Sequence, residues 1–186
     1  MSIQPSRRLF SVAEYDQMVE TGILREDDRL ELIEGEIVAM SPIGSPHAAC
    51  VRRLTRVLPR LLGDRTQLSV QCPVVIPDWS EPNPDVALLV PRDDDYVDAH
   101  PLPRQVQVLI EVADSSLAYD TQVKAPLYAK AGIRELWIVD LKAKRVVVYT
   151  RPRSGRYSVM RVHGVRDRFT SPRFAGAEFA VRELLP

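Results

Sequence analysis

The sequence predicts an α/β (α+β) fold in which a central mixed β-sheet is flanked by helices. Segments with helical spacing of apolar residues alternate along the chain with short apolar runs typical of buried strands. The chain has 186 residues, 45% hydrophobic and 27% charged, as in ordinary soluble globular proteins. We therefore expect a single domain over 1–186, with a core over about 28–150 and a C-terminal strand extension over 151–186.

The N-terminal part is expected to form a helix, a hairpin and a second helix. Ser11 is a suitable N-cap and Glu14 completes a capping box, which predicts a helix over 11–20. Residues 29–40 have the pattern of two strands joined by a bend at Glu34-Gly35. Apolar residues at helical spacing predict a helix over 47–62, with Pro59 kinking or shortening its last turn.

The remaining chain is expected to supply the sheet and one more helix. A helix is predicted over 120–131, ended by Gly132, and it tolerates Pro126 only near its start. Residues 91–103 have no periodicity and predict a loop. Apolar runs predict strands over 68–76, 86–90, 106–112, 135–140, 145–149 and 157–162, the last two paired across Ser154-Gly155, and an edge strand over 174–185.

Charge and cysteine content limit the function classes. The 25 basic and 25 acidic residues cancel, so the chain lacks the overall positive field of many DNA binders, although a local basic groove stays possible. Cys50 and Cys72 lie in apolar patterns without metal-ligand spacing, which favours two buried thiols. No apolar run has membrane length, and residues 1–8 lack a signal-peptide core, so we expect a cytoplasmic protein.

Two carboxylates are the first candidates for chemistry. Asp85 follows Asn83-Pro84 at the mouth of an apolar run, a position that an ordinary turn residue would also take. Glu111 is embedded in an apolar run, where a charge is costly unless a salt bridge or a metal compensates it. Two carboxylates on neighbouring strands can hold Mg²⁺, which prefers oxygen ligands and keeps several waters.

The following helix adds a candidate cation. Asp120 and Lys124 stand four residues apart on one helix face, with Tyr128 one turn further on. The pair could be a surface ion pair of small value. Alternatively, Lys124 leans toward the two carboxylates, where an ammonium would stabilise charge that develops on a phosphate or orient a water. Tyr128 itself is expected to pack in the core.

These residues stand in an ordered set of short motifs that resembles a known superfamily. Over residues 10–150 the sequence is similar to the PD-(D/E)XK, or restriction-endonuclease-like, nucleases, and more closely to the Uma family of restriction endonucleases. The resemblance rests on LELIEGEIV from Leu30, MSP from Met40 with His47 after it, PDV from Pro84, IEVADSS from Ile110, YDTQVK from Tyr119, and LWIVD from Leu136.

The resemblance implies a role for each matching position. Asp85 and Glu111 would be metal ligands, joined by the Val112 carbonyl. Ala113 stands where the superfamily often has its lysine, and the resemblance moves that role to Lys124.

Two further positions follow from the same frame. Glu31 resembles an additional acidic site residue, with Glu34 and Glu36 as rivals in the same hairpin. His47 would be a substrate contact, whereas a lone histidine near a helix start more often caps the helix or lies at the surface.

The resemblance thus implies an Mg²⁺-dependent endonuclease that hydrolyses phosphodiester bonds of DNA, with Mn²⁺ able to substitute. The partners would be nucleic acid, with RNA as an alternative to DNA, and a second copy in a homodimer. The competing hypothesis is a catalytically silent protein that kept the fold as a nucleic-acid-binding or protein-interaction module. An exposed apolar face on 145–185 would favour the interaction module.

Overall fold

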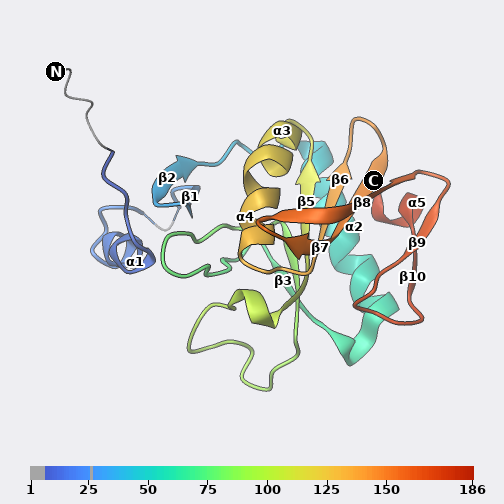
Figure 1. Cartoon of the computed structure of the whole chain (residues 1–186), viewed down its shortest axis with the longest axis horizontal. Helices are drawn as coiled ribbons and strands as arrows, with labels where there is room; N and C mark the ends of the chain where they lie inside the picture. The colour runs from blue at the N-terminus through green and yellow to red at the C-terminus, as the bar shows by residue number, and fades with distance from the viewer. Residues whose placement is uncertain (1–6, 26) are drawn as a thin grey trace.

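The computed structural model describes residues 7–25 and 27–186. Its centre is a six-stranded sheet in the order β3-β4-β5-β6-β7-β8, in which β5 and β6 are parallel and the other neighbours antiparallel (Figure 1). The strands are β3 (Gln67–Val70), β4 (Val86–Leu89), β5 (Val106–Ala113), β6 (Glu135–Asp140), β7 (Arg145–Arg153) and β8 (Arg156–Gly164). The predicted mixed sheet flanked by helices is confirmed.

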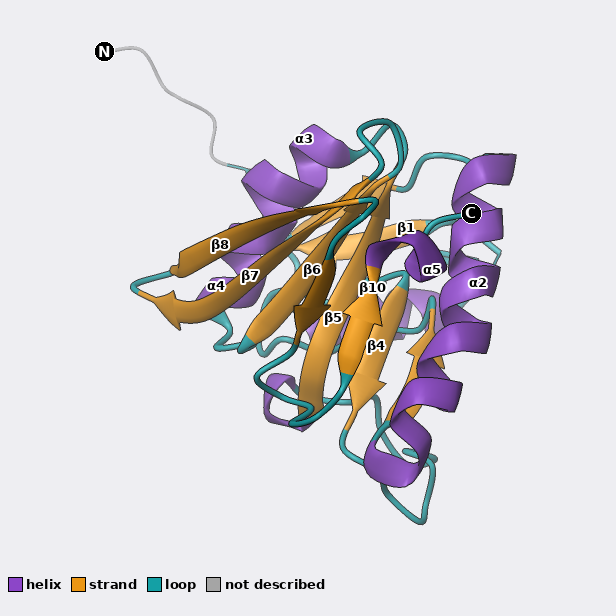
Figure 2. Cartoon of the chain, turned by 90° about the vertical axis from the view of Figure 1, so that its right-hand side faces the viewer, coloured by secondary structure: helices purple, strands orange, loops and turns teal. Residues whose placement is uncertain are grey.

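Helices cover both faces of this sheet (Figure 2). Helix α2 (Ser45–Leu62) packs on one face and α4 (Ala125–Lys130) on the other. Successive side chains of a strand point to opposite faces. Along β5, Val108, Ile110 and Val112 join the core under α2, while Leu109 and Ala113 join the core under α4. Glu111 falls between Leu109 and Ala113 and therefore points to the α4 face.

The N-terminal elements match the prediction. Helix α1 (Val12–Glu20) has Ser11 as its N-cap, and the reciprocal hydrogen bonds of the capping box with Glu14 are present. Strands β1 (Leu30–Ile33) and β2 (Glu36–Ala39) form a separate antiparallel hairpin. Gly35 has a φ of +83°, and a Cβ there would lie 2.7 Å from the Cβ of Leu9, so the turn needs glycine.

Several predicted boundaries are wrong for local reasons. The strand predicted over 68–76 ends at Val70, because Gln71 has a left-handed φ of +51° and the chain leaves the sheet there. Cys72 is consequently exposed, whereas Cys50 is buried as expected, and both are free thiols. Helix α2 ends at Leu62 as predicted, and Pro59 lies inside it without shortening its last turn.

The helix predicted over 120–131 begins earlier, at Leu117, and is built from three parts. These are α3 (Leu117–Tyr119), a π-helical turn η3 (Asp120–Lys124), and α4. Pro126 lies in the first turn of α4, where the earlier condition on it is met, and Gly132 follows with a φ of +79°. A π turn is wider than an α turn and is often found at functional sites.

The C-terminal edge strand predicted over 174–185 is wrong. The segment instead contains β9 (Arg168–Thr170) and β10 (Glu178–Ala180), which pair with each other, and the short helix α5 (Val181–Leu184). Phe179, Val181 and Leu184 are buried in the core that α2 also covers. The apolar residues of the tail therefore complete one face of the sheet, while residues 145–164 extend the sheet itself. None of the described helices is long and apolar enough to cross a membrane.

A buried carboxyl couples the attachment of α1 to pH. Glu81 is 6% exposed, and burial, with the charge and hydrogen bond of Asp16 on α1, raises its pKa to about 7. Because the folded pKa lies above the unfolded one, this contribution to stability is complete below pH 4.5 and is lost as pH rises through about 7.

Glu81→Gln should therefore remove a pH dependence of unfolding. The difference in free energy of unfolding between the variant and the wild type should shift in favour of the variant by about 2 kcal/mol from pH 5 to pH 8. Urea titrations at each pH measure this difference. An equal difference between the two proteins at both pH values would contradict the assignment.

Candidate active site

Strand register brings the two predicted carboxylates together. Val86 pairs with Ile110, so Asp85, one residue earlier, lies opposite Glu111. The Asp85 backbone N–H donates to Oε2 of Glu111 at 3.4 Å, and the two residues are only 8% and 2% exposed. Both point to the sheet face under α4, at the end where β4 begins and β5 ends. Asp85 is thus not the simple turn residue that its Pro-Asp context alone suggests.

Asp85 is held by three donors from different elements. Its Oδ2 accepts from the Val112 N–H at 2.8 Å, and its Oδ1 accepts from Nε2 of Gln71 at 3.3 Å. Nε2 of His47, in the first turn of α2, lies 3.0 Å from Oδ2. His47 therefore faces the site, as the family frame implied, instead of capping the helix. The N–H and C=O of one strand residue point to the same edge, so the Val112 carbonyl is directed to the Asp85 side.

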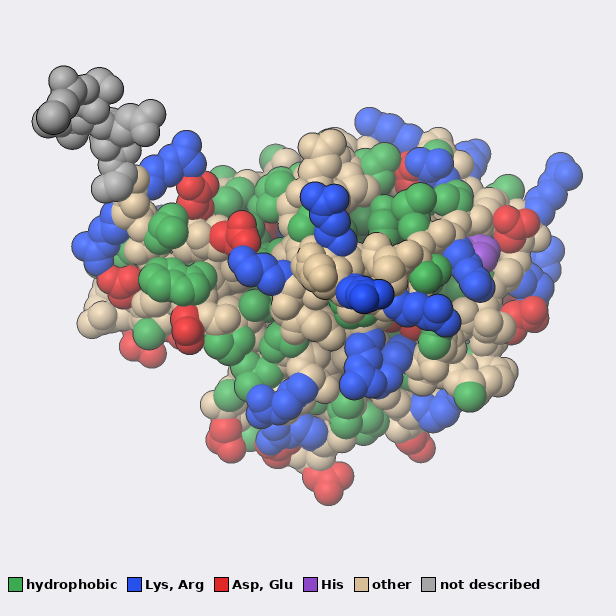
Figure 3. Space-filling model, in the orientation of Figure 1, with side chains coloured by type: hydrophobic (Ala, Val, Ile, Leu, Met, Phe, Trp, Pro, Cys, Tyr) green, Lys and Arg blue, Asp and Glu red, His purple; other side chains and the backbone are tan. Residues whose placement is uncertain are grey.

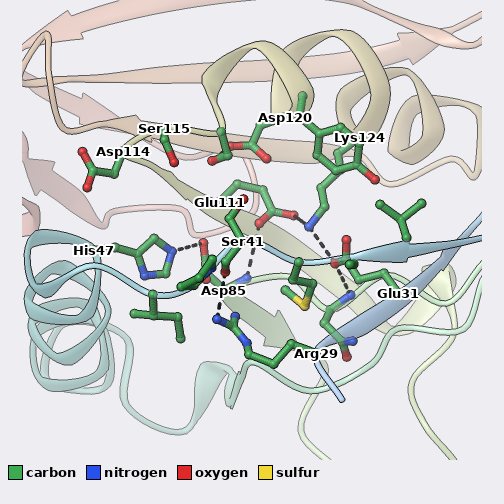
Figure 4. A pocket seen from close by; sticks show the side chains of 18 of the residues that line it. Arg29, Glu31, Ser41, His47, Asp85, Glu111, Asp114, Ser115, Asp120 and Lys124 are labelled. Atoms are coloured by element: carbon green, nitrogen blue, oxygen red, sulfur yellow. Dashed lines mark hydrogen bonds and ion pairs between the residues drawn. The ribbon is translucent and has the colours of Figure 1, made fainter. Parts of the chain in front are cut away.

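Lys124 reaches this pair from the π turn (Figure 4). Its Nζ lies 2.8 Å from Oε1 of Glu31 and 3.3 Å from Oε1 of Glu111, and the residue is 4% exposed. The surface ion pair with Asp120 is absent from the described contacts, and Asp120 accepts instead from Oγ of Ser116 at 2.6 Å. The helix thus delivers an ammonium to the strand ends, where the sequence has Ala113 in place of a lysine.

The charge states follow from burial and neighbours. Burial alone would lower the pKa of Lys124, but the carboxylates of Glu111 and Glu31 outweigh it and raise that pKa. Lys124 is therefore a permanent cation and not a proton acceptor. For Glu111, burial has the largest effect and raises the pKa to about 8, against the lowering effect of Lys124, with the nearby Asp85 charge raising it further. A second positive charge beside Glu111 would favour its ionised form.

The structure decides between the three hairpin glutamates. Glu31 is 2% exposed, and its Oε1 accepts from both Lys124 and the Asn83 N–H, the latter at 2.8 Å. The side chains of Glu34 and Glu36 are 61% and 49% exposed and lie outside the pocket. Position along the hairpin explains the difference, because Glu31 lies opposite Val38 and both line the pocket, whereas Glu34 lies in the turn and Glu36 at the turn end of β2.

Tyr128 is a contact that the sequence reasoning missed, having placed it only in the core. Its hydroxyl donates to Oε1 of Glu111 at 2.6 Å, in full burial. Burial first, and then the charges of Glu111 and Glu31, raise the pKa of Tyr128 well above its usual value, so the hydroxyl stays a donor. Its position four residues after Lys124 was the available signal.

Tyr128→Phe should destabilise the protein by about 1–2 kcal/mol, because a buried carboxyl loses a hydrogen bond. Tyr157→Phe is the matched control, since among the described residues the buried Tyr157 hydroxyl has no partner. Thermal unfolding of both variants tests this difference, and an equal loss from the two changes would show that the Tyr128 hydroxyl contributes nothing specific.

The carboxylates and Lys124 line a pocket of about 530 Å³. Its rim comes from the loop after β2 and from the loop between β5 and α3, including Ser41, Gly44 and Ser115, and Arg29 adds a second cation. Arg29 is held by a hydrogen bond of 2.9 Å to the Ser41 carbonyl. The pocket is open enough for a phosphate and its neighbouring groups to enter from solvent.

The donor set fits a hard cation that keeps waters. Within 7–25 and 27–186, no three His, Cys, Asp or Glu side chains form a metal-binding group. A cation here would have Asp85 and Glu111 as its side-chain ligands, and it would need the Val112 carbonyl, waters or a phosphate for the rest. Mg²⁺ is bound in this way, by one or two carboxylates together with substrate phosphates.

Comparison with known proteins identifies the family and the fold. A family model described as "Putative restriction endonuclease" (Uma2) matches residues 12–182. A crystal structure of "a putative nuclease" from Anabaena variabilis is similar in fold, with a TM-score of 0.74 and 19% sequence identity over 94% of this chain and 97% of that one. The search of curated proteins finds no match.

Proposed function

The chain belongs to the Uma2 family of restriction-endonuclease-like proteins, and from this premise we propose that it is an Mg²⁺-dependent endonuclease acting on the phosphodiester bonds of DNA. The observation that carries the proposal is the convergence of Asp85 and Glu111 at the base of a pocket, with the Lys124 ammonium 3.3 Å from Glu111. Two neighbouring buried carboxylates with a buried cation beside them have the composition of a phosphoryl-transfer site.

In the proposed reaction Asp85, Glu111 and the Val112 carbonyl would hold Mg²⁺, for which Mn²⁺ could substitute. The bound cation would polarise the phosphate and lower the pKa of a coordinated water. Lys124 would stabilise the negative charge that develops on the phosphate oxygens, because its ammonium cannot lose its proton at working pH. Glu31 holds Lys124 in place, and Tyr128 holds Glu111.

His47 has a different part in the proposal. Its Nε2 binds Asp85, while its Nδ1 is buried and has no partner among the described residues. We assign it to orienting Asp85 beside the entering substrate, and the contact to substrate that the resemblance implied stays a prediction. Carboxylates that bind metal are commonly oriented by a hydrogen bond from a neighbour.

Metal removal tests the proposal directly. Purified protein should nick or cut supercoiled plasmid with Mg²⁺ or Mn²⁺, and EDTA should abolish the reaction. Asp85→Asn should also abolish it, whereas Asp98→Asn, an exposed carboxylate of the loop over 91–103, should leave the rate unchanged. Cleavage that survives both EDTA and Asp85→Asn would overturn the proposed site.

The same assay addresses the substrate and the assembly. DNA is the proposed substrate, and faster cleavage of a matched RNA would reassign it. One pocket cuts one strand, so a homodimer should convert plasmid to linear product while a monomer accumulates nicked circles. Binding of nucleic acid without any cleavage would instead support the silent nucleic-acid-binding module.

A further inference from the structure

The outer face of α2 carries a row of arginines. Over its 18 residues α2 contains four arginines and no aspartate, glutamate or lysine. Arg52, Arg56 and Arg60 are exposed and stand four residues apart, on the side opposite to the buried Leu54 and Leu58. We call Arg52, Arg56 and Arg60 the α2 arginine row. Helix α2 runs along the outside of the molecule, where its outer side is uncovered (Figure 2).

The row is not balanced by the protein itself. Several other exposed arginines have acidic partners, such as Arg8 with Glu14 and Arg168 with Glu178. Among the described residues none of the three row arginines makes an ion pair. Like charges four residues apart on a helix repel and destabilise it. On a surface helix with no binding role, mixed charges are more stabilising than charges of one sign. The unbalanced row therefore indicates an external polyanion as its partner.

The place of the row points to nucleic acid. The same helix starts at the candidate site, since Gly44 and His47 line the pocket. At 1.5 Å per residue, the row begins about 8 Å along the helix axis from His47 and ends about 20 Å from it. A polymer whose scissile phosphate lies in the pocket would extend over neighbouring surface for that distance, which is about six base pairs of duplex.

A second set of arginines lies elsewhere and serves as a control. Figure 3 shows Lys and Arg side chains gathered over the C-terminal strands. Asp140 at the site end of β6 pairs with Ala113 and Arg145, whereas Glu135 at the other end pairs with Thr150. Arg151, Arg153 and Arg156 therefore lie past the far end of β6, where β7 and β8 continue as a hairpin, and all three are exposed.

We propose that the α2 arginine row binds the phosphate backbone of the nucleic acid whose strand enters the pocket. This inference rests on the proposed function for the identity of the polyanion. Arginine suits the task because its planar guanidinium donates two hydrogen bonds to one phosphate and never loses its charge. The row would contribute affinity without sequence preference, since it contacts no base edge.

The test compares two variants of equal charge. Arg52→Gln/Arg56→Gln/Arg60→Gln and Arg151→Gln/Arg153→Gln/Arg156→Gln each remove three charges from the full chain. Binding to a labelled DNA duplex of about 30 base pairs is measured by anisotropy in EDTA, where no cleavage occurs. The variant without the row should lose at least tenfold in affinity. The negative slope of the logarithm of its binding constant against the logarithm of the salt concentration should become shallower by about 2 to 3, at roughly 0.9 per phosphate contact. The Arg151→Gln/Arg153→Gln/Arg156→Gln variant should change this slope by less than one.

Each other outcome overturns the inference. Equal losses in the two variants would show a general charge effect, and unchanged binding in the row variant would show that the backbone lies elsewhere. Row-dependent binding to phosphatidylserine vesicles without DNA binding would assign the row to a membrane surface.

Binding and cleavage are separate readouts, so failure of the inference and failure of the proposed function give different results. Because binding is measured without metal, a protein that binds through the row but never cuts would retain the inference and lose the nuclease proposal. A protein that cuts plasmid normally with the row removed would retain the nuclease and lose the inference. Circular dichroism spectra of the row variant should match the wild type, since none of its three side chains is buried.

Discussion

Glu111→Gln is expected to lower Mg²⁺-dependent cleavage roughly 10³-fold or more, because a cation at the site contributes several kcal/mol of charge stabilisation and loses one of its two side-chain ligands. Glutamine keeps an oxygen for the Tyr128 hydroxyl, so the local packing is retained. Single-turnover cleavage of plasmid at saturating Mg²⁺ measures the effect. Glu36→Gln, an exposed glutamate on β2, is the control.

The stability of the same variant separates a functional glutamate from a structural one. Burial disfavours the ionised form of Glu111, so removing the charge should leave the melting temperature in metal-free buffer unchanged or raise it. A variant that melts several degrees lower than the wild type would show that the loss of activity comes from the fold. Retained cleavage in a well-folded Glu111→Gln protein would remove this residue from the site.

Lys124→Met should have the second large effect, on both activity and stability. Without the ammonium, Glu31 and Glu111 share a buried space with no cation, and breaking a buried ion pair in this way costs about 3–5 kcal/mol. Turnover should fall by about 10²–10³, as for the loss of a donor to developing charge. Chemical unfolding and single-turnover assays measure the two effects separately.

A second substitution separates the two roles of Lys124. Lys124→Met/Glu31→Gln removes both partners of the 2.8 Å contact, and it should recover most of the stability but none of the turnover. Lys130→Met is the control, since Lys130 and Glu34 form an exposed pair, where a change of under about 0.5 kcal/mol is expected. Recovery of turnover in the double variant would assign Lys124 a purely structural role.

Features of the fold that depend on residues close together in the sequence could be predicted, and features that depend on contacts between distant segments could not. The elements with local signals were placed well: the capping box at Ser11, the bend at Glu34-Gly35, and the apolar runs of β4, β5 and β6. The tail over 174–185 was misplaced, because its apolar residues pack on α2 and Trp137 through contacts that no local pattern encodes.

The candidate site shows the same division. From their local context Asp85 suggested a turn and Lys124 a surface pair, and only the order of the motifs joined them to Glu111. The convergence itself depends on the β4–β5 register and on the π turn, and no residue pattern predicts a π turn. The choice of Glu31 over Glu34 and Glu36 likewise needed the place of each residue along the hairpin relative to the pocket.

The contact between Lys124 and Glu31 joins residues 93 positions apart, and this separation has a consequence for the order of folding. Contacts between distant segments form after the loop between them has closed, and therefore late. The β1–β2 hairpin, the β4–β5 pair and the helical segment that contains η3 each supply one part of the pocket. A partly folded chain therefore holds no assembled site. Any hydrolytic activity of the proposed site would arise only when these distant segments have all come together.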